Sequence, residues 1–318
     1  MRFELTSDQR DFAGSLESLL ASADTVSAAR GWADGDHTPG LKLWERLAEQ
    51  GVTMLATEAS PVEVVVAFEA LGRHAVPGPW VESAAYLPVA LGHEVESVAT
   101  VAVPPHAPYA LDADVADSVY LAGPDGIAEA EVGERHDSVD RTRRLFEVRG
   151  PDTSSPGGSE YSTTEAFDLA VLAAAAQLLG LGERVLTDTV TYAKQRRQFG
   201  REIGSYQAIK HRLADVRIAL DFARPLVFGA ALVSAGSTTE RGSTTERAQS
   251  ASAAKVMCGD AAYLASRTGL QVHGAIGYTQ EFDLSIWITK IRALLTAWGT
   301  PAFHRARILE SLVARSTG

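Results

Sequence analysis

Apolar residues recur every three or four positions through the first ninety residues. Phe12, Leu16 and Leu20 fall on one face of a helix, and Thr6 and Gln9 precede them at the spacing of a capping box. The same helical spacing recurs in three further segments, over residues 43–48, 62–71 and 80–91. The sequence therefore predicts a small helical domain over residues 1–96.

The pattern changes near residue 97. Short β-prone runs, separated by Pro, Gly and Asp, cover residues 98–103, 118–122, 127–132 and 145–148. They span only about fifty residues, which is enough for a small sheet. The stretch GPDTSSPGG over 150–158 has the composition of a linker. We expect a reduced β-domain and linker over residues 97–158.

The longest helical pattern covers residues 165–195, about 45 Å of helix, and Ser162–Glu165 has the spacing of a second capping box at its start. Within it, Leu169–Leu179 is nearly all Ala and Leu, which predicts burial on most sides. Further helices are predicted over residues 206–235, 248–271, 282–297 and 301–314, with the tandem repeat GSTTERGSTTER (236–247) as a polar loop. A mainly α fold with a C-terminal four-helix bundle over residues 159–318 follows.

Composition narrows the class of protein. The chain has 318 residues, 46% of them hydrophobic, and 29 Lys+Arg against 40 Asp+Glu give a net charge of −11. This charge argues against nucleic acid or an anionic membrane as a partner. No apolar run approaches the roughly 18 residues of a membrane span, and the first ten residues lack a signal-peptide core. The single cysteine, Cys258, fits a reducing compartment, so we expect a cytoplasmic protein.

Common catalytic and metal motifs are missing. No serine has the G-x-S-x-G setting, the eight histidines never pair at metal-binding spacing, and one cysteine cannot form a zinc site. Gly180 and Gly182 resemble the start of a dinucleotide loop, but no strand precedes them and Val185 stands where the third glycine belongs. Cys258 lies in an apolar helical pattern and is expected to be buried rather than nucleophilic.

Two stretches carry a more specific pattern. Residues 192–207 read YAKQRRQFGREIGSYQ, and residues 271–278 read QVHGAIGY, with Gly299–Thr300 further on. A turn rich in Arg and Gly between two helices can present guanidinium and N–H groups to a diphosphate. Taken alone, however, Arg196 and Arg197 are better explained as residues that cap the C-terminal end of a helix, where cations are favoured.

In order and separation these stretches strongly resemble the C-terminal bundle of the acyl-CoA dehydrogenase family. The pattern LWxxLAxxGV over 43–52 and the pair Gly78–Pro79 resemble its helical domain. The resemblance implies FAD as cofactor, held by these residues in the site of a neighbouring subunit, with the arginine at the diphosphate and the glycine at the adenosine end. The implied FAD-binding residues are Arg196, Gln198, Phe199, Gln207, Gln271 and Gly274. Ala275 replaces the second glycine of the usual pair.

The catalytic base of the family has no counterpart at its usual positions. The family reaction needs a carboxylate that removes the α-proton of an acyl-CoA. The glutamate that usually precedes Gly-Thr is Trp298 here, and the alternative position, twenty-nine residues before Phe199, is Ala170. Asp168 lies two residues away, but two residues turn a helix by about 200°, so we expect it to face elsewhere as a solvated or capping residue.

The middle domain also departs from the family. The T-E-P-x-x-G-S-D stretch that binds the isoalloxazine has no equivalent, and the β-prone segment is about half the usual size. The chain keeps the parts that reach a neighbour's flavin and lacks parts that build its own. This asymmetry resembles the short subunit of actinobacterial steroid-type acyl-CoA dehydrogenases. Such a subunit pairs with a full-length subunit in an assembly of two long and two short chains (α2β2).

Two other functions remain open at this stage. One is a self-sufficient homo-oligomeric enzyme, a dehydrogenase or a dehydratase, that uses an unrecognised base. The other is a flavin-free scaffold or regulatory subunit. The resemblance favours the short subunit of a heteromeric FAD-dependent enzyme that acts on an acyl-CoA.

Overall fold

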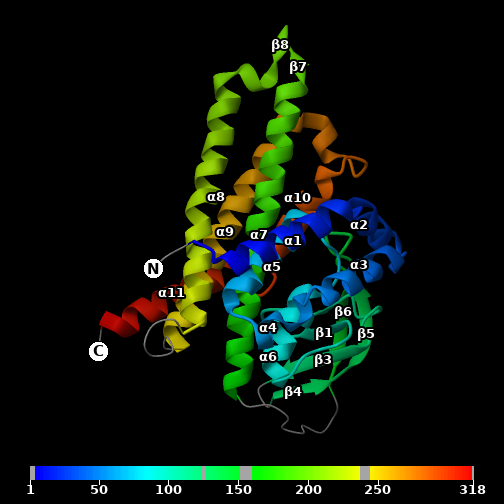
Figure 1. Ribbon diagram of the computed structural model, residues 1–318, viewed down its shortest axis with the longest axis vertical. Helices are drawn as coiled ribbons and strands as arrows, with labels where there is room; N and C mark the ends of the chain where they lie inside the picture. The colour runs from blue at the N-terminus through cyan, green and yellow to red at the C-terminus, as the bar shows by residue number, and fades with distance from the viewer. Residues whose placement is uncertain (1–3, 124–125, 151–159, 237–243, 317–318) are drawn as a thin grey trace.

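The computed structural model describes residues 4–123, 126–150, 160–236 and 244–316 (Figure 1). Most of the predicted linker and most of the predicted polar loop lie outside the described residues. The end of the repeat, from Thr244, is already helical.

Helices build the N-terminal region. Their bounds are α1 (Ser7–Ser22), α2 (Thr25–Asp34), α3 (Thr38–Glu49), α4 (Leu55–Glu58), α5 (Pro61–Arg73) and α6 (Leu87–Leu91), with the short turns η1 (Val52–Met54) and η2 (Glu82–Tyr86). The capping box of Thr6 and Gln9 is present at α1, as predicted. Helix α2 was not predicted. The predicted helix over 80–91 contains η2, a five-residue π-helical turn, a rare conformation that often marks functional sites.

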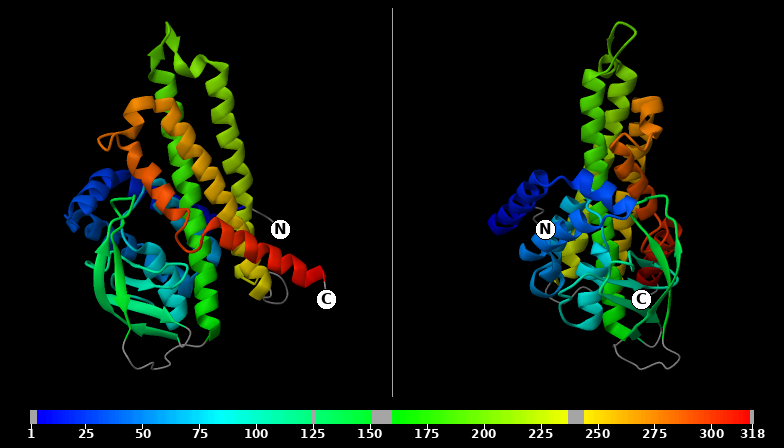
Figure 2. Two further views of the ribbon diagram at one scale, coloured as in Figure 1. Left: turned by 180° about the vertical axis from the view of Figure 1, so that it is seen from behind. Right: turned by 90° about the vertical axis from the view of Figure 1, so that its right-hand side faces the viewer.

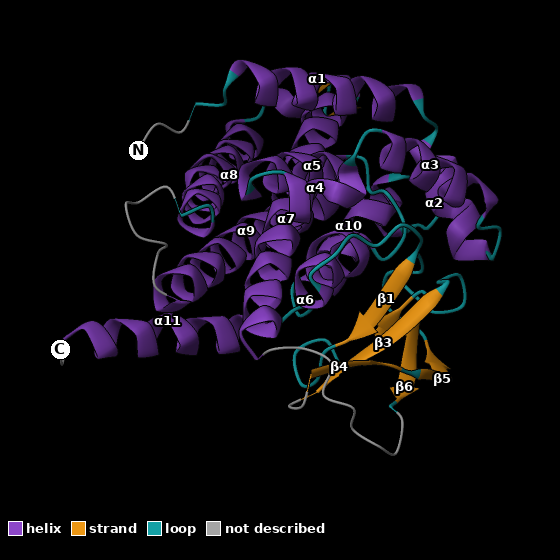
Figure 3. Ribbon diagram, turned by 60° about the horizontal axis from the view of Figure 1, so that its bottom comes forward, coloured by secondary structure: helices purple, strands orange, loops and turns teal. Residues whose placement is uncertain are grey.

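The β-prone segment forms two small sheets in the described residues rather than one. The first has the order β1 (Ala99–Ala102), β3 (Ser118–Gly123), β4 (Gly126–Glu129), and the second the order β2 (Ala110–Leu111), β6 (Leu145–Arg149), β5 (Glu131–His136). The predicted run 127–132 divides at Ala130 between β4 and β5, so one run serves both sheets. Figure 3 shows the strands gathered at one side of the helices.

Long helices form the C-terminal bundle. They are α7 (Glu160–Gln195), α8 (Gln207–Ser234), α9 (Thr244–His273), α10 (Leu284–Leu294) and α11 (Pro301–Ser316), joined by a hairpin of β7 (Arg197–Gln198) and β8 (Arg201–Glu202) and the turns η3 (Ile203–Ser205) and η4 (Gly274–Tyr278). Figures 1 and 2 show the hairpin at the far end of the α7–α8 pair. The predicted capping box at Ser162–Glu165 is wrong, because α7 already begins at Glu160 and the four residues lie inside it.

Helix α7 is the core helix of the fold. Every residue of Leu169–Leu179 is at most 8% exposed, as predicted. One prediction needs correction: Thr163–Gln195 is long and apolar enough to span a membrane, but 89% of its apolar window is buried within the protein. The apolar character of this helix is thus accounted for by its packing inside the fold.

Glycines let α5 and α7 touch. A Cβ added at Gly180 would lie 2.0 Å from the carbonyl oxygen of Glu69, and one at Gly72 would lie 2.2 Å from that of Gln177. A Cβ at Gly182 would lie 2.8 Å from Leu220 on α8. The pair of Gly180 and Gly182 therefore serves helix packing, in agreement with the prediction that it is no nucleotide loop.

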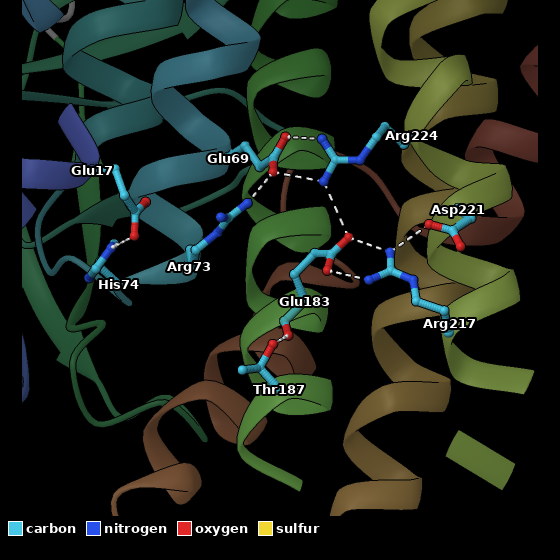
Figure 4. Close-up of polar contacts among 9 residues, drawn as sticks. All are labelled: Glu17, Glu69, Arg73, His74, Glu183, Thr187, Arg217, Asp221 and Arg224. Atoms are coloured by element: carbon cyan, nitrogen blue, oxygen red, sulfur yellow. Dashed lines mark hydrogen bonds and ion pairs between the residues drawn. The ribbon is translucent and has the colours of Figure 1, made fainter. Parts of the chain in front are cut away.

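A polar network ties the N-terminal helices to the bundle (Figure 4). Arg224 on α8 donates to both carboxylate oxygens of Glu69 on α5, at 2.8 and 2.9 Å, and to Glu183 on α7 at 3.2 Å. Arg217 holds Glu183 through two bonds of 2.7 and 2.9 Å. Because Glu69 is only 6% exposed, these bonds compensate the burial of its charge.

Candidate functional site

Four of the six predicted cofactor residues lie at the tip of the α7–α8 pair. Arg196 follows α7, Gln198 lies in β7, Phe199 lies in the hairpin turn and Gln207 opens α8. Phe199 and Gly200 form the two-residue turn with φ of +51° and +81°, the geometry that a tight hairpin requires. Phe199 is 90% exposed. All four side chains are exposed at the tip.

The other two predicted residues lie at the same end of the bundle. Arg212 of α8 donates a hydrogen bond to Gln271 near the end of α9. Tyr192 of α7 stacks on His273, with ring centroids 4.1 Å apart. Gly274 follows with φ +64°, and no heavy atom lies within 4 Å of the place a Cβ would take. The space beside Gly274 is thus open, and its left-handed conformation favours glycine.

The arginine at position 196 does not cap α7. No hydrogen bond or ion pair joins its exposed side chain to any described residue, whereas Arg197 bonds the carbonyl of Gly200 at 3.5 Å. Arg201 stacks over the ring of Tyr206, 3.8 Å from its centroid. No contact in the described residues therefore supports a capping role for Arg196. The role of Arg196 in binding FAD stays a prediction.

A second candidate site is a cavity of about 710 Å³ beside Trp298. This volume lies within the usual range for small-molecule sites. The walls come from η2, the loops 105–109 and 138–145, and the end of α10 with the turn 296–300. Trp298 is 1% exposed and has φ +59°, and the next residue, Gly299, donates its N–H to the carbonyl of His106 at 3.2 Å.

Glu82 supplies a carboxylate to this cavity. Its side chain is 4% exposed, and its Oε2 has no hydrogen-bond partner in the described part of the chain. Burial raises the pKa of Glu82, while the charge of Arg143 and the side chain of Trp298 oppose that rise. Glu82 was not among the residues predicted from the sequence. The available signal was a single charged residue within the apolar run 80–91.

Two cations line the same cavity. Arg143 is half-buried and Arg292 is exposed, and neither side chain has an ion pair among the described residues. The remaining lining is largely apolar or small, and includes Pro105, Ala107, Pro108, Leu145, Ala293 and Ala297. The cavity thus combines a buried carboxyl group, apolar walls and unpaired positive charge.

The residues considered from the sequence as positions of a catalytic base on α7 are Ala170 and Asp168, and neither brings a carboxylate to this cavity. Ala170 is fully buried in α7 and has no carboxylate. Asp168 was predicted to be solvated or capping, and this is wrong: it is 1% exposed and pairs with Arg307 at 2.6 Å and Arg247 at 3.4 Å. It does not line the cavity beside Trp298. The two arginines fix it as a partner within the fold, because a carboxylate this deeply buried needs compensating charge.

A buried histidine fixes the turn at Trp298, and it makes stability depend on pH. His304 lies 3.0 Å from the Trp298 carbonyl and 3.1 Å from the Ser252 hydroxyl, and burial lowers its pKa to about 3. Between pH 6.5 and 3 only the unfolded chain binds this proton, so stability falls as the pH falls. We expect His304 to contribute a loss of about 2 kcal/mol between pH 7 and 5.

The test is urea denaturation at several pH values, on the native chain and on His304→Gln. The variant should lose stability less steeply below pH 6.5, whatever its stability at pH 7. A variant whose stability falls with pH as steeply as that of the native chain would contradict the assignment.

Comparisons with known proteins give a consistent picture. The family described as acyl-CoA dehydrogenase, C-terminal domain, matches residues 158–313. The chain is 28% identical over 324 residues to acyl-CoA dehydrogenase IpdE2 of Mycolicibacterium smegmatis, covering 96% of this chain and 97% of that protein.

Solved structures share the fold. The ChsE4–ChsE5 complex from Mycobacterium tuberculosis has a TM-score of 0.80 at 20% identity, over 98% of this chain and 99% of that chain. A variant of the Tcur3481–Tcur3483 steroid ACAD also has a TM-score of 0.80, at 18% identity, over 98% and 99%. At these identities the likeness is one of fold, and it extends over the whole length of both chains.

Proposed function

Because the chain belongs to the acyl-CoA dehydrogenase family, we propose that it is the short subunit of a heteromeric FAD-dependent acyl-CoA dehydrogenase. Such an enzyme removes two hydrogens from the α and β carbons of an acyl-CoA thioester, and FAD, when bound, accepts the hydride. The short subunit would complete the FAD site of a full-length partner.

The separation between the two candidate sites carries this proposal. Trp298 at the cavity contacts Phe167 on α7, with ring centroids 6.1 Å apart. The tip hairpin follows Gln195 at the other end of the same helix. The 28 residues from 167 to 195 span about 42 Å of helix. A cofactor at the tip is therefore far from this chain's own cavity, which supports a role for the tip in a site on another chain.

The groups at the tip fit a diphosphate. Arg196 has an exposed guanidinium group with no ion pair or hydrogen bond to the part of the chain that the structure describes, and Arg197 lies next to it. No heavy atom lies within 4 Å of a Cβ built at Gly200 or Gly274, so backbone can be approached closely at both. Arginine pairs with phosphate oxygens through charge-assisted bonds. In this proposal Arg196 and the hairpin backbone hold the diphosphate, and Gln271 and Gly274 lie toward the adenosine.

Exposed apolar faces support an assembly. Ile218, Phe222 and Leu226 recur every four residues on α8 and are 40–67% exposed. On α11, Leu309, Leu312 and Val313 are 49–60% exposed. Contiguous apolar surface of this kind is typical of interfaces. We propose a full-length acyl-CoA dehydrogenase subunit as the partner, in an assembly of two copies of each in the cytoplasm.

The substrate in this proposal is a steroid-derived acyl-CoA. The support is the fold shared with a steroid ACAD and with a two-component complex. A second candidate function, a self-sufficient homo-oligomeric enzyme, is supported by Glu82, because that residue gives the chain an acid–base group of its own. Flavin content of the chain purified alone separates the two: the heteromeric subunit should be colourless, and the self-sufficient enzyme yellow.

Arg196→Ala tests the proposed role of the tip. The variant complex should lose FAD affinity by more than tenfold, equivalent to about 1.5–3 kcal/mol, because a charge-assisted contact to the diphosphate is removed. The measurement is FAD titration of the complex, followed by flavin fluorescence.

The matched control is Arg46→Ala, which removes an exposed arginine from α3. It should leave FAD affinity unchanged. Equal affinity in the Arg196→Ala and native complexes would overturn the role given to the tip.

A further inference from the structure

We propose that Glu82 is the proton-transferring residue of an acyl-thioester site in the cavity beside Trp298. The class of ligand rests on the proposed function, while the site itself rests on this chain's own residues. Positions 170 and 298, where the carboxylate was expected, hold Ala and Trp, and Glu82 brings a carboxylate to the cavity wall from a different element.

Glu82 differs from the other buried carboxylates that the structure describes. Glu69, Asp112, Asp140 and Asp168 each form an ion pair with an arginine or a lysine. Oxygens of Asp112, Asp140 and Asp168 also lack a hydrogen-bond partner, but each of these carboxylates faces the cation of its ion pair. Glu82 forms no ion pair within the described ranges, and its unpartnered Oε2 therefore has no cation to compensate it. A buried polar atom left unpaired costs free energy, so a site that retains one is a candidate for ligand binding or catalysis.

The position of the carboxyl group is set by its surroundings. Glu82 opens the π-helical turn η2, and the next residue, Ser83, is fixed by a hydrogen bond from the backbone N–H of Ala99 to its hydroxyl at 2.9 Å. Tyr86, in the same turn, packs against Trp298 with ring centroids 5.3 Å apart. The turn is thus held against β1 and Trp298. Glu82 therefore has a fixed place in the wall of the cavity.

The arrangement of charged groups in the cavity suits a thioester with an anionic coenzyme. Exposure rises from Glu82, which is buried, to Arg143, which is half-buried, and Arg292, which is exposed. The arginines therefore lie nearer to solvent than the carboxyl group. Phosphate groups of a coenzyme would pair with the arginines while the acyl end enters among the apolar walls.

The chemical step needs no oxidant. The ionised Glu82 carboxylate takes a proton from the α-carbon, the C–H electron pair forms the enolate, and the negative charge moves to the thioester oxygen. The carboxylic acid then exchanges its proton with water and returns one to the α-carbon. In D2O the net result is replacement of α-hydrogen by deuterium, with the thioester otherwise unchanged.

The experiment follows this exchange with butyryl-CoA as the probe and the full chain, purified alone, in D2O. Mass spectrometry of the thioester gives the rate, and calorimetry gives its binding. Glu82→Gln should lower the exchange rate at least a hundredfold, the usual range for loss of a general base, while the probe still binds. Glu82→Asp should retain part of the rate, because the carboxylate is kept but shortened. Glu45→Gln, on the exposed side of α3, should exchange at the native rate.

The outcomes are decisive in both directions. Exchange that is absent in the native chain, or that persists in Glu82→Gln, would overturn the role of Glu82. Glu82→Gln could also lose exchange because it no longer folds, which loss of probe binding and of the native circular dichroism would reveal. In that case Glu82→Asp decides, because it must retain both the fold and the exchange. FAD affinity of the complex is a separate readout, so failure of the proposed function would be distinguishable from failure of this inference.

Discussion

Asp168→Asn will lower the free energy of unfolding of the chain by about 3–5 kcal/mol. The carboxylate is 1% exposed and lies 2.6 Å from Arg307 of α11 and 3.4 Å from Arg247 of α9. Removing its charge leaves Arg307, 18% exposed, without its anion, and leaves Arg247, 14% exposed, with only Glu165 at 4.0 Å. Breaking a buried pair in this way is strongly destabilising, because the charge that remains is uncompensated.

Glu165→Gln is the matched control for this prediction. Glu165 lies one turn before Asp168 on α7, its side chain is 53% exposed, and it is 4.0 Å from the same Arg247. An exposed pair at this distance contributes less than about 1 kcal/mol. Urea denaturation of both variants gives the comparison. If Asp168→Asn costs no more than Glu165→Gln, the ion pairs do not stabilise α9 and α11 against α7.

Gly180→Ala will destabilise the chain by roughly 3 kcal/mol, at the upper end of the usual effect of overpacking. The added Cβ would lie 2.0 Å from the carbonyl oxygen of Glu69 and 2.8 Å from the backbone nitrogen of Arg73. Both are backbone atoms of α5, which cannot rotate away, so α5 and α7 must separate. The bonds from Arg224 to Glu69 join α5 to α8, so a shift of α5 disturbs them as well.

The same substitution at Gly14 provides the control. Gly14 lies inside α1, is exposed and has no heavy atom within 4 Å of an added Cβ. Alanine should stabilise α1 there by up to about 1 kcal/mol, because it restricts the unfolded backbone. The midpoint temperature of thermal denaturation should therefore fall for Gly180→Ala and rise for Gly14→Ala. A Gly180→Ala variant as stable as the native chain would show that α5 and α7 tolerate a wider separation.

Periodicity predicted the long helices well because they are local. The predicted range 165–195 became 160–195, and 206–235 became 207–234. Helix α2 was missed since its buried residues, including Ala28 and Trp32, form too short a stripe to stand out. The division of the β-prone segment into two sheets depends on pairing between strands distant in sequence, as in the parallel contact of β1 with β3. Local propensity does not encode such pairing.

The two candidate sites also differ in how far local sequence could predict them. The tip residues occur close together in sequence and could be recognised as a pattern. Gly200 suits one of the two positive φ values that their tight turn requires. The cavity joins Glu82 to Trp298, 216 positions apart, so no spacing rule could link them. Likewise, Asp168 looked solvated because its partners, Arg247 and Arg307, come from helices later in the chain.

The burial of the middle of α7, over residues 168–182, has a consequence for cooperativity. A single hydrophobic core extends from Leu16 in α1 through Leu172 in α7 to Trp298, and α5, α8 and α9 all share the surface of α7. Removing either end of the chain would expose one flank of the same helix to water. Among the described residues the N-terminal helices and the bundle share this core, whereas the sheet of β2, β5 and β6 has a small cluster of its own at Ala110, Ala113 and Phe146. The N-terminal helices and the bundle therefore act as one cooperative unit, and local melting at the cavity is coupled to the ordering of the helix that carries the tip.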